Sequence, residues 1–153
     1  MGESIVFGGP DAYAGFLAHL HEDEVATVLS YAQVRRYAVG ALVVRVGETE
    51  RSVYIVTAGR FEVLVPSRTG AQRATVLQRG DMFGELAFFD GQPRSADVRA
   101  IEDSETLVMT PAGFERLRLT HPRLALSFVL DLGRILSVRF RDYSARFADL
   151  GNA

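Results

Sequence analysis

The sequence predicts a mainly β fold, a jelly-roll-like β-roll flanked by helices. Between residues 34 and 109, short runs rich in β-branched and aromatic residues alternate with glycine-containing turns. Before and after this region, apolar residues recur at the three-to-four-residue spacing of helices. Strands this short and evenly punctuated are typical of sandwiches, jelly rolls and small barrels. We therefore expect one domain, spanning residues 1–153, with helices on both sides of a β core.

The sequence predicts helices at both ends of the chain and six short strands between them. Residues 11–32 are expected to be helical, with a break near His21-Glu22. The strand candidates are residues 42–46, 53–56, 61–65, 75–77, 98–101 and 106–109. Thr110 is a good N-cap and Pro111 suits the first helical position, which predicts a helix over residues 111–121. Pro122 then opens a second C-terminal helix, over residues 122–148.

Composition excludes several classes of function. The net charge is −2, and all 17 basic residues are arginine, so we expect no direct binding to nucleic acid. Without cysteine there are no disulfides and no thiolate metal sites. The N-terminus lacks the features of a secretory signal, and no apolar run is long enough for membrane insertion. We expect a cytoplasmic protein, or a cytosolic domain of a larger protein, membrane proteins included.

One segment, residues 83–98, does not follow the alternation of short strands and glycine-containing turns. Gly84 permits a positive φ or a close backbone approach, and the next five residues suit a short helix. The first N–H groups of such a helix favour anions. Arg94 follows a turn, and its planar guanidinium suits an oxyanion. Together with the carboxylate of Glu85, this predicts a ligand that carries both hydroxyls and a phosphate.

The segment resembles the phosphate-binding cassette of the cyclic-nucleotide-binding domain family. The matching residues are Gly84-Glu85-Leu86-Ala87 and, after the turn, Pro93-Arg94-Ser95-Ala96. The interval is similar to that of regulatory subunits of cAMP-dependent kinase, and the resemblance to catabolite-activator sensor domains runs over about residues 12–148. It implies a β-roll that binds cAMP or cGMP as a regulatory module of bacterial signal transduction, without enzymatic activity or any further cofactor.

The resemblance also assigns roles to single residues. It implies that Arg94 pairs with the cyclic phosphate and that Glu85 accepts the ribose 2′-hydroxyl proton. Ser95 and Ala96 would offer the phosphate a hydroxyl and a backbone N–H. The remaining residues implied as ligand contacts are Phe83, Gly84, Leu86 and Ala87 around the sugar phosphate, with Arg139 and Phe140 at the purine. Because stacking discriminates weakly between purines, we expect modest selectivity, with cAMP, the commoner bacterial ligand of the family, slightly preferred.

The last helix carries a seam of apolar residues with three- and four-residue spacing. Its members are Val129, Gly133, Leu136, Phe140, Tyr143, Phe147 and Leu150. Such a seam is compatible with a homodimer, with a helix that folds back over the ligand, or with plain core packing. An effector domain, in cis or in trans, would receive the signal.

Two other interpretations remain beside the sensor. The domain could be a degenerate β-roll that has lost its ligand and acts in interaction or dimerisation, with Glu85 and Arg94 as a structural ion pair. It could also be a metal-dependent β-roll enzyme. The second is disfavoured because no histidine lies within residues 34–109, and because His19 and His21 fall on different sides of a helix.

Overall fold

The computed structural model of the chain describes residues 17–151, which form four helices and eight strands. The helices are α1 (Glu22–Ser30), α2 (Glu85–Asp90), α3 (Pro111–Thr120) and α4 (Pro122–Gly151). The strands are β1 (Gln33–Tyr37), β2 (Leu42–Val44), β3 (Val53–Ala58), β4 (Arg60–Ser67), β5 (Gly70–Gln78), β6 (Met82–Phe83), β7 (Asp97–Ala100) and β8 (Ser104–Met109).

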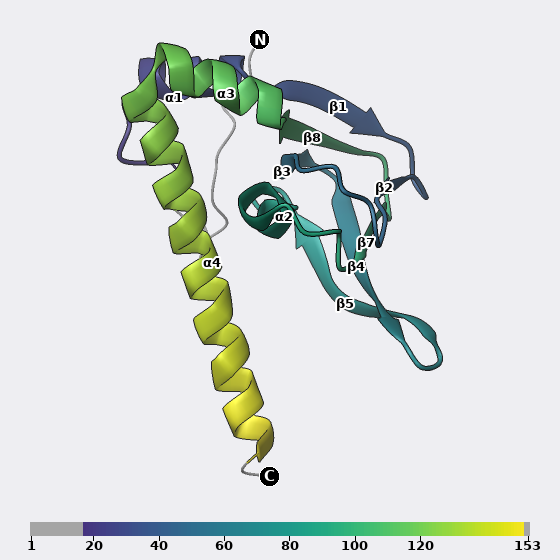
Figure 1. Cartoon of the computed structure of the whole chain (residues 1–153). Coiled ribbons are helices and arrows are strands. Elements are labelled where there is room, and N and C mark those ends of the chain that lie inside the picture. The colour runs from purple at the N-terminus through teal and green to yellow at the C-terminus, as the bar shows by residue number, and fades with distance from the viewer. Residues whose placement is uncertain (1–16, 152–153) are drawn as a thin grey trace.

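The strands build two antiparallel four-stranded sheets that face each other (Figure 1), in agreement with the predicted β-roll. One sheet has the order β1-β8-β3-β6, and the other has the order β2-β7-β4-β5. Strands β1 and β6 were not among the predicted strands, and β5 was predicted only over residues 75–77. Both β1 and most of β5 carry exposed, polar residues, so they lack the apolar pattern by which a strand is recognised.

The strand β3 shows why the fold has two apolar cores. Its residues 53–56 are all buried, but they alternate between two clusters. Tyr54 and Val56 point into the roll, where they meet residues of the second sheet such as Phe61. Val53 and Ile55 point the other way, against helix residues such as Phe128. The first sheet is therefore covered on both faces, and its strand reads as a continuous apolar run.

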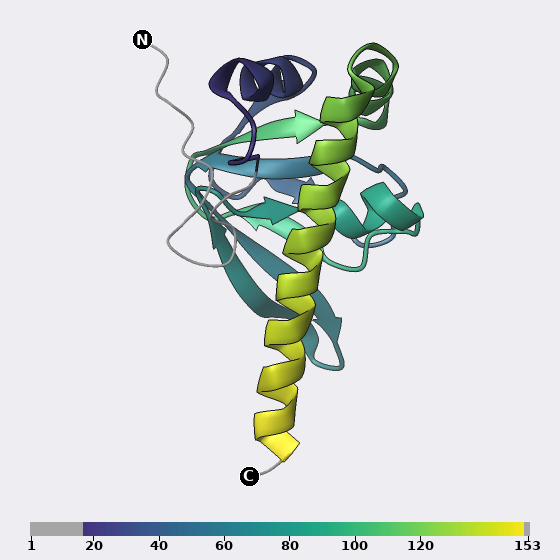
Figure 2. The ribbon, with the colours of Figure 1, turned by 90° about the vertical axis from the view of Figure 1, so that its left-hand side faces the viewer.

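Helices α1, α3 and α4 lie on the outer side of the first sheet (Figure 2). The 30-residue α4 is roughly 45 Å long at ~1.5 Å per residue, and it runs from α3 past the sheets toward the level of the β4–β5 hairpin. It starts at Pro122 as predicted and extends three residues beyond the predicted end.

The N-terminal prediction is only partly correct. Residues 11–16 lie outside the described part of the chain, and residues 17–20 form a turn in place of a helix. Leu17 has a left-handed φ of 56°, which a helix cannot contain. Helix α1 begins at Glu22, next to the expected break, and the carboxylate of Glu24 accepts a hydrogen bond from the N–H of His21.

The core between the first sheet and the helices predicts that two leucines of α3 contribute very differently to the free energy of unfolding. Leu117 is fully buried, whereas Leu119 is 68% exposed. Leu117→Ala should lower the free energy of unfolding by about 2–5 kcal/mol, because it removes buried methyl groups and leaves a cavity. Leu119→Ala, the matched control, should change it by less than about 0.5 kcal/mol. Urea unfolding of both variants measures the difference, and equal values would contradict this packing.

Candidate functional site

A cavity of about 820 Å³ lies between the second sheet, the segment 83–98 and the second half of α4. This volume is within the usual range for a small-molecule site. Nine of the ten predicted site residues line it: Phe83, Gly84, Glu85, Leu86, Ala87, Arg94, Ser95, Ala96 and Arg139. Residues that the sequence had not assigned to the site also line it, among them Gln78, Arg79, Asp142, Tyr143 and Arg146.

The segment 83–98 is shaped by two glycines that bracket α2. Gly84 has a φ of 84° and Gly91 a φ of 67°, so the chain enters and leaves the short helix in the left-handed region. A Cβ atom at Gly84 would lie 2.7 Å from the carbonyl oxygen of Ser52 and 2.8 Å from Nη1 of Arg94. The position therefore needs glycine for two reasons, the backbone conformation and the space.

The C-terminal end of α2 is held by Arg51. Its Nε and Nη2 atoms donate hydrogen bonds of 3.2 Å each to the carbonyl oxygens of Ala87 and Phe88. Carbonyl groups in the last turn of a helix have no partner within the helix, and a cation is favourable there. Arg51 thus fixes the helix whose first turn, with Glu85, faces the cavity.

Arg94 is the buried cation of the site, with 6% of its surface exposed. Its Nη1 donates to the carbonyl oxygen of Gly84 at 2.9 Å. Its Nη2 donates to the carbonyl oxygen of Ser52 at 2.8 Å and to Oε2 of Glu50 at 3.0 Å. The Arg94 backbone is fixed as well, because its N–H donates to the carbonyl oxygen of Glu48 at 2.8 Å.

Glu50 supplies the negative charge beside this guanidinium. Burial acts to raise the pKa of Glu50, but hydrogen bonds from Ser52 and from the Arg94 guanidinium outweigh burial and hold the pKa below its usual range. Tyr54 also donates to Oε2 of Glu50, at 3.3 Å, while burial and the adjacent Glu50 charge raise the pKa of Tyr54 to about 12. Arg94 is therefore paired with a carboxylate at neutral pH.

Glu85 is the second buried charged group of the site, and it is contacted by a side chain of α4. Only 6% of Glu85 is exposed. Nη1 of Arg139 donates to Oε1 of Glu85, and Nη2 of Arg139 donates to the carbonyl oxygen of Met82. We had expected Arg139 to lie over a purine. The structure instead pairs it with the carboxylate that the sequence predicted for the ribose.

Phe140 lies outside the cavity, contrary to the expected stacking position. Its side chain is 71% exposed, and it is absent from the cavity wall. Each helical residue turns by ~100°, so Phe140 points to a different side from Arg139, whereas Tyr143, four residues after Arg139, points to the same side. Tyr143 lines the cavity. The four-residue spacing between Arg139 and Tyr143 could have identified Tyr143 from the sequence. Nothing in the sequence indicated Glu50, which lies 44 residues before its partner Arg94.

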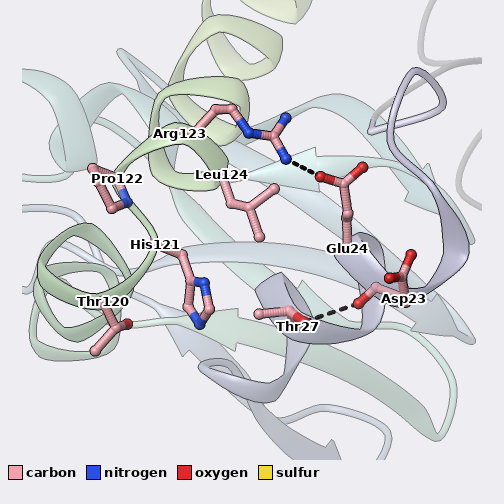
Figure 3. Close-up of a pocket in the computed structure, with 8 residues that line it drawn as sticks. All are labelled: Asp23, Glu24, Thr27, Thr120, His121, Pro122, Arg123 and Leu124. Carbon is pink, nitrogen blue, oxygen red and sulfur yellow. Dashed lines mark hydrogen bonds and ion pairs between the residues drawn. The ribbon is translucent and has the colours of Figure 1, made fainter.

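A second, smaller hollow of about 400 Å³ lies where α1 meets the α3–α4 turn (Figure 3). The Arg123 guanidinium crosses it to pair with the Glu24 carboxylate, and His121 and Thr27 line it. Its charged groups are thus paired with each other or exposed, and it lacks the buried cation and buried acid of the larger cavity. The larger cavity is the candidate site.

Comparison with known proteins agrees with this geometry. The family model described as the cyclic nucleotide-binding domain matches residues 34–121, which include the whole segment 83–98. The chain belongs to the cyclic nucleotide-binding domain family. The segment 83–98 is therefore called the cassette below.

Relatives and solved structures of the family are similar over most of the chain. The HTH-type transcriptional regulator Cmr of Mycobacterium tuberculosis is 31% identical over 123 residues, which are 80% of this chain and 50% of that protein. A cyclic nucleotide-binding domain from Methylobacillus flagellatus has a TM-score of 0.80 at 23% identity, over 85% of this chain and 74% of that one. The Thermus thermophilus catabolite activator protein has a TM-score of 0.77 at 27% identity, over 89% and 62%.

The chain spans about half the length of the relatives it matches in sequence. Within residues 17–151, none of the helices combines the length and the apolar character needed to cross a bilayer.

The cassette geometry predicts that two glycines with the same backbone conformation differ in their tolerance of a side chain. Gly47 has a φ of 86°, and nothing lies within 4 Å of an added Cβ, so Gly47→Ala should cost only the left-handed strain of about 1–2 kcal/mol. Gly84→Ala should cost at least about 1 kcal/mol more, because its Cβ meets backbone and guanidinium. Chemical denaturation compares them, and an equal cost would mean that Arg94 does not lie against Gly84.

Proposed function

We propose that this domain is a non-catalytic sensor that binds a cyclic nucleoside monophosphate in the cavity between the cassette and α4. The observation that carries the proposal is the presence of one buried cation, Arg94, and one buried acid, Glu85, in the wall of the same cavity. A small ligand that is anionic at one end and carries hydroxyls beside it satisfies both groups at once.

The phosphate is proposed to bind at Arg94. A guanidinium has five N–H groups, and the three hydrogen bonds described above involve only Nη1 and Nη2. The Nε–H group thus remains for a phosphate oxygen, and charge-assisted bonds of this kind are strong. Ser95, Ala96 and the first N–H groups of α2 complete the anion site, since these N–H groups have no acceptor within the helix.

The ribose is proposed to bind at Glu85, with Arg139 beside it. The carboxylate accepts the 2′-hydroxyl proton through an oxygen that is not fully used by Arg139. Because Arg139 belongs to α4, a ligand at Glu85 meets that helix directly. Occupancy of the cavity therefore changes the balance of α4 positions, which an effector in cis or in trans can read.

For the purine, Tyr143 takes the stacking role first expected of Phe140. It lines the cavity one helical turn beyond Arg139. Stacking on a phenol ring discriminates only weakly between adenine and guanine. Selectivity between cAMP and cGMP is therefore expected to be modest, with cAMP slightly preferred. The Thermus thermophilus relative named cyclic AMP receptor protein, 30% identical over 118 residues, supports that order.

The outer side of α4 supports the proposal of a homodimer. Phe140 of the predicted seam is 71% exposed, and Leu126 and Leu130 on the same helix are 58% and 62% exposed. Apolar side chains at three- and four-residue intervals are what a paired helix requires. Sedimentation equilibrium over a range of concentrations tests this association.

The phosphate assignment gives the first binding prediction. Arg94→Ala should weaken the binding of cAMP and cGMP by about 2–5 kcal/mol, because the phosphate loses its charged partner. The control is Arg99→Ala, which removes an arginine that pairs with Glu62 outside the cavity and should leave affinity unchanged. Calorimetric titration of nucleotide-free protein measures both. If Arg94→Ala binds as tightly as the wild type, the phosphate site lies elsewhere.

The assignment of Glu85 to the ribose gives the second binding prediction. The wild type should bind 2′-deoxy-cAMP about tenfold or more weakly than cAMP, since a buried acceptor loses its hydrogen bond. Glu85→Gln should lose part of this discrimination while retaining the shape of the site. Competition titrations with the ribo and deoxy ligands provide the comparison. Equal affinity of the wild type for the two ligands would remove Glu85 from the site, and no binding of either would favour the ligand-free interaction module.

A further inference from the structure

A buried acid outside the cavity ties the N-terminal segment to α4. Asp131, in the middle of α4, is 6% exposed. Its Oδ2 accepts a hydrogen bond of 2.6 Å from the backbone N–H of Leu17, 114 residues earlier in the chain. His19 Nδ1 lies 3.6 Å from the same oxygen, and Arg134 Nη2 lies 3.7 Å from Oδ1. One carboxylate thus organises residues 17–19 on the surface of the helix.

The residue that Asp131 holds is itself in an unusual state. Leu17 is the one residue other than glycine with a positive φ among residues 17–151, and its side chain is 1% exposed within the core between the first sheet and the helices. Left-handed backbone is unfavourable for leucine, so it persists only where the surroundings fix it. The buried N–H also needs an acceptor, and the Asp131 carboxylate is that acceptor.

The same helix carries both this contact and the cavity contact. Asp131 and Arg139 are eight residues apart, about 12 Å along the axis, and eight residues turn ~800°, which leaves the two side chains roughly 80° apart. Asp131 faces the N-terminal segment, and Arg139 faces Glu85. A shift or rotation of α4 at one contact therefore moves the other, because the helix between them is continuous.

We propose that Asp131 is a positioning residue that sets the resting position of α4 by anchoring it to Leu17, and that cavity occupancy and the Asp131–Leu17 contact are coupled through the helix. This inference rests on the proposed function, because the coupling concerns the cyclic nucleotide. Thermodynamic linkage makes the coupling reciprocal: if the ligand favours the α4 position that Asp131 holds, the ligand strengthens the Leu17 contact, and the contact strengthens ligand binding.

The test uses the full chain in four forms: wild type, Asp131→Ala, Asp131→Asn and Glu115→Ala. Glu115 is the matched control, an exposed acid on α3 that pairs with its neighbour Arg118. Two quantities are measured for each form, the affinity for cAMP and cGMP by calorimetry and the amide hydrogen exchange of Leu17 by NMR. Circular dichroism verifies that each form is folded.

The coupling predicts a defined pattern. Saturating cAMP should slow the exchange of the Leu17 amide in the wild type. Asp131→Ala should accelerate that exchange at least about tenfold and weaken cAMP binding about fivefold or more, within the usual range of coupling between two sites. Asp131→Asn keeps an oxygen acceptor, so its exchange rate and its cAMP affinity should lie between those of the wild type and Asp131→Ala. If the alanine variant does not fold, the asparagine variant decides on the same two measurements. Glu115→Ala should match the wild type in both.

Two results would overturn the inference, and they are distinguishable. If the wild type binds cAMP or cGMP and Asp131→Ala binds it equally well, Asp131 has no positioning role, whereas the proposed function stands. If the wild type binds neither nucleotide, the proposed function fails and the coupling fails with it, even where the Leu17 amide is protected by Asp131.

Discussion

The burial of the Arg94 guanidinium is the constraint to which the rest of the cassette conforms. A cation withdrawn from water needs oxygen partners on most of its N–H groups. They come from Glu50 and from the carbonyl groups of Ser52 and Gly84, in two loops that meet only in the folded chain. Position 84 must then be glycine, because any Cβ would push against that guanidinium. The guanidinium is thereby fixed in the cavity wall by carboxylate and carbonyl groups of the chain itself.

The long helix α4 links the two halves of the domain. Its first half supplies Phe128, Leu132 and other residues to the core against the first sheet, so it is part of the packing that holds the domain together. In its second half, residues 140–146 are exposed, and Arg139 reaches Glu85. A helix that is packed into the core at one end and bonded to the cavity wall through Arg139 at the other is suited to convert events in the cavity into displacement.

The sequence was most informative where local pattern and local chemistry coincide. The apolar strands β3 and β8, the cap at Thr110 and the cassette from Gly84 to Ala96 all follow from neighbouring residues. Contacts between distant residues were not predictable in this way. The partners of Arg94 and the acceptor of the Leu17 N–H lie more than 40 residues away, except for Gly84, and polar β5 is a strand because it pairs with β4. Phe140 was misplaced because one helical step, about 100°, separates the cavity wall from solvent.

The arrangement of aromatic rings around the cavity has an optical consequence. The chain has five tyrosines and no tryptophan, so its near-ultraviolet emission comes from tyrosine alone. Tyr54 stacks on Phe83 at 4.7 Å, with its hydroxyl on Glu50 and the Arg94 guanidinium 6.0 Å from its ring. Tyr143 borders the cavity from α4. Tyr143 in the cavity wall and Tyr54 beside Arg94 therefore make the intrinsic fluorescence of the unlabelled chain sensitive to a change in the surroundings of either residue.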